Sequence, residues 1–203
     1  MRTRSAGFVS LATLLVIGGL AVIVVLTWLP YSRAASTAAI ERTTLKQVRS
    51  LLRATLALPR CDLTDAGLAT KVAERVARAT GAEFTRLDLG PSSKGFAFWF
   101  RSEDYAFMAC LANSKDLPAP VPVRLPLEVY AWPISRWSDG RSAFFWAEDL
   151  PLAHSRNLHA GYVGLEPAQR PVPGAGRPRD VAAAREEGDY RGHDDERWIL
   201  ARP

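Results

Sequence analysis

The chain has 203 residues, of which 48% are hydrophobic, and this length suits one domain with a membrane anchor. Its formal net charge is +5, yet basic and acidic residues are interspersed and no run of five or six basic residues occurs. This pattern argues against direct binding of nucleic acid.

The first predicted element is a long apolar stretch close to the N-terminus. No charged residue lies between Arg4 and Arg33. A hydrocarbon layer about 30 Å thick needs roughly 20 apolar residues, and a soluble helix would have the polar face that this stretch lacks. We therefore expect residues 8–30 to form a transmembrane helix. Arg2 and Arg4 favour a cytoplasmic N-terminus, which places the rest of the chain outside the cytoplasm.

A cleaved secretory signal is the first alternative for this stretch. The small residues around Ser32-Arg33-Ala34 would offer a cleavage site. The apolar core of such a signal is normally about 7–15 residues long, which is shorter than the run seen here. Gly18 and Gly19 would allow another helix to approach closely within the lipid, although glycine is common in membrane helices generally.

The helical pattern continues beyond Pro30 through residues 31–60. Apolar side chains recur there at intervals of three and four residues: Leu45, Val48, Leu52 and Leu56. This spacing predicts an amphipathic helical extension that ends at Pro59, with a kink at Pro30. Two separate helices joined near Pro30 remain the alternative.

Residues 61–165 are expected to form an α+β head. A helix is predicted over 62–81, with Asp62 or Thr64 as its N-cap and Gly81 as its C-cap. Six strand-like segments follow: 83–89, 95–101, 104–112, 123–132, 142–148 and 158–165. A hairpin turn is expected at Asp139-Gly140. Short connections favour an antiparallel sheet, and the apolar stripe of the long N-terminal helix would cover one of its faces.

The strands carry many aromatic side chains, among them Trp99, Phe100, Phe144, Phe145 and Trp146. Alternation along a strand would bury about half of them in the core. The other half would then form an exposed apolar patch that binds a partner.

The two cysteines, Cys61 and Cys110, are the only thiols of the chain. Outside the cytoplasm they are expected to form one disulfide that joins the helical half of the head to the sheet. The alternative is a pair of unrelated buried thiols. No catalytic motif, cofactor motif or zinc-ligand spacing occurs, and His154, His159 and His193 are interpreted as ordinary surface residues.

The last segment, residues 166–203, is rich in proline, glycine and charge, and it is interpreted as a mobile tail or a long loop. The residues from His193 to Glu196 could hold a hard cation loosely, but a solvated tail is the preferred interpretation. Trp198, Ile199 and Leu200 would allow the tail to return as an edge strand or to contact a partner.

The N-terminus resembles that of type IV pilins and of the pseudopilins of type II secretion. A short basic leader, residues 1–7, ends in Gly7 and is followed by Phe8 and the apolar helix. The stretch from Leu29 to Ser36, with its proline and tyrosine, is similar to the end of the apolar part of a pilin helix. The resemblance covers about the first 60 residues. It implies cleavage after Gly7 by a prepilin-type peptidase, and a pilin-like fold with a long helix under an antiparallel sheet.

One position departs from the family pattern. Most members carry a glutamate four residues after the phenylalanine, whereas this chain has Ala12. The resemblance therefore implies a minor or tip-type subunit of an envelope filament or secretion machine. Such a subunit is a non-enzymatic assembly protein of the bacterial inner membrane with a periplasmic head. Its partners would be membrane lipid, other pilin-like or envelope-complex subunits and the peptidase. The alternative is an uncleaved single-pass anchor that carries a periplasmic binding module of another envelope complex.

Overall fold

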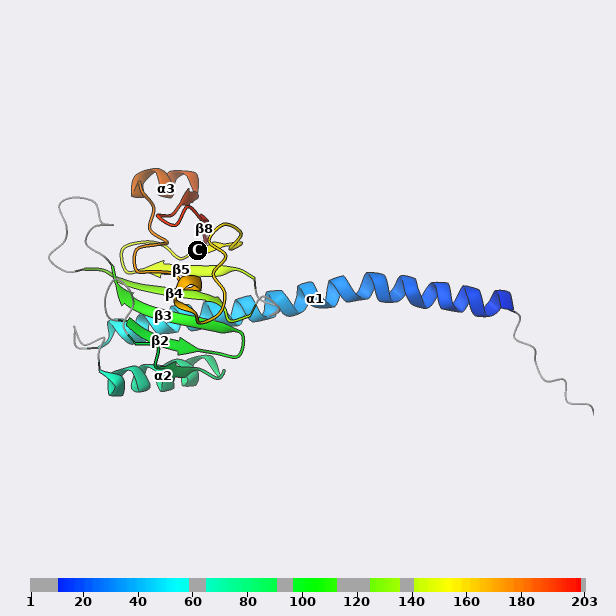
Figure 1. Ribbon diagram of the computed structural model, residues 1–203, viewed down its shortest axis with the longest axis horizontal. Helices are drawn as coiled ribbons and strands as arrows, with labels where there is room; N and C mark the ends of the chain where they lie inside the picture. Colours follow the sequence, from blue (N-terminus) through cyan, green and yellow to red (C-terminus); the bar gives the residue numbers. More distant parts are fainter. Residues whose placement is uncertain (1–10, 59–64, 91–96, 113–124, 136–140, 202–203) are drawn as a thin grey trace, which may run out of the picture.

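The protein consists of one long helix that projects from an α+β head (Figure 1). The computed structural model describes residues 11–58, 65–90, 97–112, 125–135 and 141–201, and for residues 11–14 it describes the backbone alone. The predicted fold class is confirmed, because a long N-terminal helix packs against an antiparallel sheet.

Helix α1, Leu11–Leu56, is continuous through Pro30, so the alternative of two separate helices is wrong. Its C-terminal half supplies the buried side chains Val48, Leu51, Leu52 and Ala54 to the core of the head. The predicted stripe is therefore correct at Val48 and Leu52. Leu45 is partly buried, and Leu56 is 36% exposed and lies outside the core.

Helix α2, Ala66–Thr80, lies beside α1 and packs the side chains of Val72 and Val76 into the same core. Its N-cap is Asp65, whose carboxylate accepts hydrogen bonds from the backbone N–H groups of Gly67 and Leu68. The caps proposed from the sequence, Asp62 and Thr64, lie outside the described residues. The C-cap is Gly81, as predicted, and its φ of 66° is a conformation that suits glycine.

Eight strands form a single antiparallel sheet in the order β1-β2-β3-β4-β5-β6-β8-β7. Their bounds are β1 Thr85–Leu87, β2 Ala97–Arg101, β3 Tyr105–Leu111, β4 Leu127–Pro133, β5 Ala143–Ala147, β6 Ala153–Ser155, β7 Asp189–Arg191 and β8 Arg197–Leu200. Each of the first five predicted strand segments contains one strand. The sixth prediction is wrong, because residues 158–165 form a loop and the strand precedes them as β6. The turn predicted at Asp139-Gly140 lies outside the described residues.

The central strands are buried on both faces. On β3, Tyr105 and Phe107 point towards the helices, whereas Ala106 and Met108 belong to a second apolar cluster on the opposite face. The expected exposed aromatic patch is therefore not found in the described part of the head. Phe100 and Phe144 lie under the helices, while Trp99 and Phe145 are buried on the other side, and Trp146 is partly buried against the helix-side cluster.

The second face is covered by the C-terminal segment. This segment contains a 3₁₀ turn, η2 Pro167–Gln169, a short helix, α3 Val181–Glu187, and the hairpin β7–β8. The predicted mobile tail is therefore wrong for the described residues 166–201. The physical reason is that Ala175, Arg177 and Trp198 are buried against the sheet. Strand β8 does return to the sheet as expected, but it lies between β6 and β7 and so is not an edge strand.

Candidate functional site

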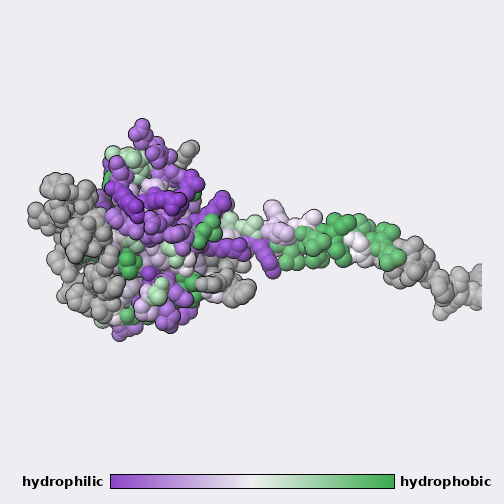
Figure 2. All heavy atoms as spheres, turned by 45° about the horizontal axis from the view of Figure 1, so that its top comes forward, coloured by the Kyte–Doolittle hydropathy of each residue, from purple (hydrophilic) through white to green (hydrophobic). Residues whose placement is uncertain are grey.

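The N-terminal half of α1 is exposed and apolar from Leu15 to Tyr31. It is long and apolar enough to cross a membrane, and within the described residues it is the one helix with this property. Figure 2 shows it as a hydrophobic rod that leaves a largely hydrophilic head. Exposed apolar area of this extent is unfavourable in water, so lipid or a partner must cover it.

Gly18 and Gly19 lie within this rod. A Cβ atom added at either glycine would meet nothing within 4 Å outside the helix itself. Among the described residues the two glycines therefore have no packing partner, and the expectation that they allow a close helix–helix approach in lipid stays a prediction. The proposed processing site, Gly7 and Phe8, lies outside the described residues.

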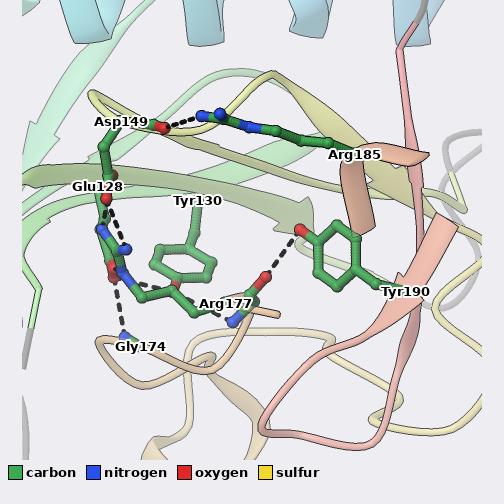
Figure 3. A network of polar contacts seen from close by, with 8 residues as sticks. Glu128, Tyr130, Asp149, Gly174, Arg177, Arg185 and Tyr190 are labelled. Atoms are coloured by element: carbon green, nitrogen blue, oxygen red, sulfur yellow. Dashed lines mark hydrogen bonds and ion pairs between the residues drawn. The ribbon is translucent and has the colours of Figure 1, made fainter. Parts of the chain in front are cut away.

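The head contains a buried polar network at the centre of the sheet face away from the helices (Figure 3). Strand β4 places Glu128 on this face, where its side chain has no exposed area. Its carboxylate contacts Nε of Arg177 and accepts hydrogen bonds from the Tyr130 hydroxyl at 3.0 Å and from the Gly174 N–H at 2.8 Å. Both oxygens of the carboxylate are thus engaged by the protein itself.

Arg177 joins this carboxylate to a second one. Its Nη1 and Nη2 atoms each donate to Asp149 at 2.9 Å in a bidentate pair. Burial alone would lower the pKa of Arg177, but the hydrogen bonds and charges of Asp149 and Glu128 outweigh burial and raise it. Arg177 therefore keeps its positive charge at neutral pH in the folded protein.

The same burial acts on the partners of Arg177. It raises the pKa of Glu128, against the opposing influence of Arg177 and the hydrogen bonds from Gly174 and Tyr130. It also raises the pKa of Tyr130, whose hydroxyl accepts a hydrogen bond from the Gly176 N–H at 3.3 Å. The buried members of this network, Glu128, Tyr130 and Arg177, join the C-terminal segment to the central strand, and Asp149 is its partly exposed end.

A second polar cluster lies at one end of the β6–β8 pair. The buried Glu196 carboxylate accepts hydrogen bonds from the Ser155 hydroxyl and from the N–H groups of Leu158, His159 and Ala160. Burial alone would raise the pKa of Glu196, but these hydrogen bonds outweigh it and lower the pKa. The carboxylate therefore holds the loop after β6 in one conformation.

The residues from His193 to Glu196, considered above as a loose cation site, have structural partners. Asp194 accepts hydrogen bonds from the Tyr162 hydroxyl at 2.7 Å and from the Trp198 indole at 3.3 Å. Asp195 pairs with Arg179 at the surface. Among the described residues, no group of three His, Cys, Asp or Glu side chains is placed to hold a metal ion. The sequence interpretation did not predict that Asp194 and Glu196 are bonded within the head. The available signal was the apolar stretch that begins at Trp198, directly after them, because such a stretch tends to pack against the core.

The expected disulfide has no support in the structure. Cys110 lies on β3 as a buried free thiol, and Cys61 lies outside the described residues. Cys110 belongs to the cluster on the sheet face opposite the helices, whereas Cys61 falls between α1 and α2 in the sequence. The thiol of Cys110 therefore faces away from the helical half of the head. Burial raises its pKa well above the ordinary value, and nearby Glu128 adds to this effect.

The described residues of the head line at least two open hollows. One, of about 240 Å³, lies between residues 39–47 of α1 and the turn at residues 102–104. The other, of about 280 Å³, lies beside the loop that Glu196 holds and includes Arg141, Arg156, Leu158 and Tyr162 in its lining. Their linings differ: the first includes Ser102, Glu103 and Asp104, whereas the second includes two arginines.

Comparison with known proteins adds no family to this description. No protein-family model, no curated protein and no solved structure matches the chain.

Proposed function

We propose that the chain is a single-pass, non-enzymatic assembly subunit of the bacterial envelope, built like a pilin, with its N-terminus in the cytoplasm and its head in the periplasm. The observation that carries the proposal is the division of α1 into two halves. The half from Leu15 to Tyr31 is bare and apolar, and the half from Thr44 to Leu52 is part of the core of the head. One rigid helix therefore connects the lipid-facing part to the head.

The polar groups of the head support a structural role. Glu128, Arg177 and Glu196 are buried, and each is bonded to the protein itself. A catalytic acid or base needs access to a substrate proton, which none of these three groups has.

Mass spectrometry of the mature N-terminus tests the proposal. Chain purified from the membrane fraction of cells that contain a prepilin-type peptidase should begin at Phe8. Replacing Gly7 by valine should leave the full-length chain, because the peptidase would no longer cut at this bond. Replacing the neighbouring Ala6 by valine is the matched control and should leave cleavage intact. A mature chain that begins at Met1 in the unaltered protein would remove the pilin-like part of the proposal.

The second candidate function is an uncleaved membrane-anchored binding module. One specific observation favours it, namely Ala12 in the position where filament subunits carry an acidic residue. Without that charge, pairing with the terminal amine of a neighbouring subunit is lost. If the chain begins at Met1 and still fractionates with the membrane, this second function is the better description.

A further inference from the structure

One end of the head faces the apolar half of α1. Ser142, just before β5, donates its hydroxyl hydrogen bond to Glu41 of α1 at 2.6 Å, and its N–H donates to the same oxygen at 3.3 Å. This contact marks the level at which the helix leaves the head. The strand register places Ser155 opposite Ala143, so the end of β6 lies at this level too (Figure 1).

The loop after β6 presents an apolar side chain with two cations beside it. Leu158 is 81% exposed, the largest exposed fraction among the large hydrophobic side chains described. Arg141 and Arg156 are exposed and line the same hollow, and none of the described residues that line it is acidic. We call Arg141, Arg156 and Leu158 together the basic corner.

The exposure of Leu158 is fixed by the fold. The Leu158 N–H donates to the buried Glu196 carboxylate at 3.3 Å, and the next two N–H groups donate to it as well. Asn157 adopts a φ of 56°, and its side chain bonds to both the N–H and the C=O of Tyr162. A loop bonded at this many points cannot turn Leu158 inward without breaking several hydrogen bonds.

We propose that the basic corner docks on the surface of an anionic lipid bilayer, the one that α1 spans. From Tyr31, at the end of the apolar rod, to Glu41 is about 15 Å along the helix at 1.5 Å per residue. The headgroup layer fills part of that distance. Transmembrane helices tilt by about 20° on average, and a tilt towards β6 brings the basic corner to the headgroups.

The charges at this end of the head agree with that direction of tilt. The acidic residues Glu103 and Asp104 lie in the turn between β2 and β3, which is several strands away from the loop after β6. Asp195, which is closer, is paired with Arg179. Lipid phosphates would thus meet two arginines on the β5–β6 side, and a leucine that can enter the interface beside them.

This inference rests on the proposed membrane anchor, and its test separates the two. The full chain, with Cys61 replaced by serine and Cys110 left buried, is reconstituted in vesicles of phosphatidylcholine with or without phosphatidylglycerol. A polarity-sensitive fluorophore is attached in turn at Leu158→Cys, at Leu111→Cys and at Val22→Cys. Leu111 is the matched control, because it is 41% exposed and lies at the end of β3 that is far from Ser142 and the apolar rod. Brominated lipids then serve as quenchers.

Quenching is expected at positions 22 and 158 but not at 111, and phosphatidylglycerol should strengthen it at 158. Arg156→Gln should weaken docking by about fivefold, the value of one basic residue near an anionic surface. Arg53→Gln, at the far end of α1, should leave docking unchanged. Quenching at 22 with none at 158 would overturn the docking and leave the anchor in place. Loss of quenching at 22 would overturn both.

Discussion

The guanidinium of Arg177 and the carboxylate of Glu128 form an ion pair in which the side chains are only 2% and 0% exposed. The pair joins residues that are 49 positions apart in the sequence. One partner belongs to the central strand β4, and the other belongs to the segment that covers it. The attachment of the C-terminal segment to the sheet therefore depends on a charge pair within an apolar surrounding.

Replacing Arg177 by methionine should destabilise the head strongly. The change leaves the Glu128 carboxylate buried without its counter-charge, which costs about 3–5 kcal/mol in comparable buried pairs. The free energy of unfolding, measured by urea titration of the detergent-solubilised chain with tryptophan fluorescence, should fall by this amount. The matched control is Arg179→Met, whose arginine is 63% exposed in its pair with Asp195. It should cost at most about 1 kcal/mol.

A double variant shows whether the stability lost in Arg177→Met comes from the unpaired Glu128 carboxylate or from lost packing of the arginine side chain. Replacing Glu128 and Arg177 together by methionine removes both buried charges and should recover most of the stability lost in Arg177→Met. Equal losses in the single and the double variants would contradict the assignment of the cost to the unpaired carboxylate.

Glu196→Gln should change the pH dependence of stability. The folded pKa of Glu196 lies below its ordinary value of 4.5, so its carboxylate stabilises the folded state fully above pH 4.5. As the pH falls below 4.5, the unfolded chain takes up the proton first and this stabilisation is lost. Wild type should therefore be more stable than Glu196→Gln by about 2 kcal/mol near neutral pH, and the difference should shrink in acid.

The difference in free energy of unfolding between wild type and Glu196→Gln is the quantity to measure, because other groups titrate in the opposite direction. Burial raises the pKa values of Glu128 and Asp194, so their protonation in acid favours the folded state. Both groups are present in wild type and in Glu196→Gln, and they cancel in the comparison. Two parallel stability curves between neutral pH and pH 3 would refute the role given to Glu196.

The helical half of the fold was predictable because its signals are local. An uncharged stretch between Arg4 and Arg33, followed by apolar residues at helical spacing, predicts α1 almost to its observed end at Leu56. The strands up to β5 follow from dense aromatic and β-branched segments with turn residues between them. The cap at Asp65 was missed, because Asp62 and Thr64, the two candidates chosen from the sequence, offer the same oxygen chemistry.

The C-terminal half was missed because its order comes from tertiary contacts. Between Glu166 and Arg197 the sequence is polar and lacks a clear period, so local propensity predicts a mobile tail. Two features pointed the other way. The central strands carry large apolar residues at successive positions, such as Phe144 and Phe145, and a strand of this kind needs cover on both faces. Trp198, Ile199 and Leu200 also formed an apolar stretch at the end of this polar segment.

The free thiol of Cys110 should be unreactive in the folded protein. It is fully buried, and its raised pKa keeps it protonated, so a thiol reagent cannot reach a thiolate. In a Cys61→Ser background, a maleimide should label the chain only after denaturation, and without prior reduction. In the unaltered chain, a requirement for reduction before any labelling would show that Cys61 and Cys110 form a disulfide after all.

Gly176→Ala tests how closely the covering segment approaches the sheet. A Cβ atom at this position would lie 2.7 Å from Cγ of Phe145 and 3.0 Å from two further ring atoms, which is closer than real carbon atoms pack. Phe145 is fully buried between Tyr130 and Trp198, so its ring cannot move aside without disturbing both neighbours. The free energy of unfolding should therefore fall by about 1–3 kcal/mol, the usual cost of overpacking.

Gly18→Ala is the control, because nothing lies within 4 Å of its added Cβ. It should leave the unfolding of the head unchanged, and any effect it has should be on association between chains in the membrane. The near-ultraviolet circular dichroism of Gly176→Ala should also weaken, since the packing of Phe145 against Trp198 is the asymmetric environment that the substitution disturbs. A Gly176→Ala protein with wild-type stability would mean that the segment from 174 to 177 can move away from the sheet. In that case the Arg177–Glu128 pair would be too adaptable to hold the covering segment in place by itself.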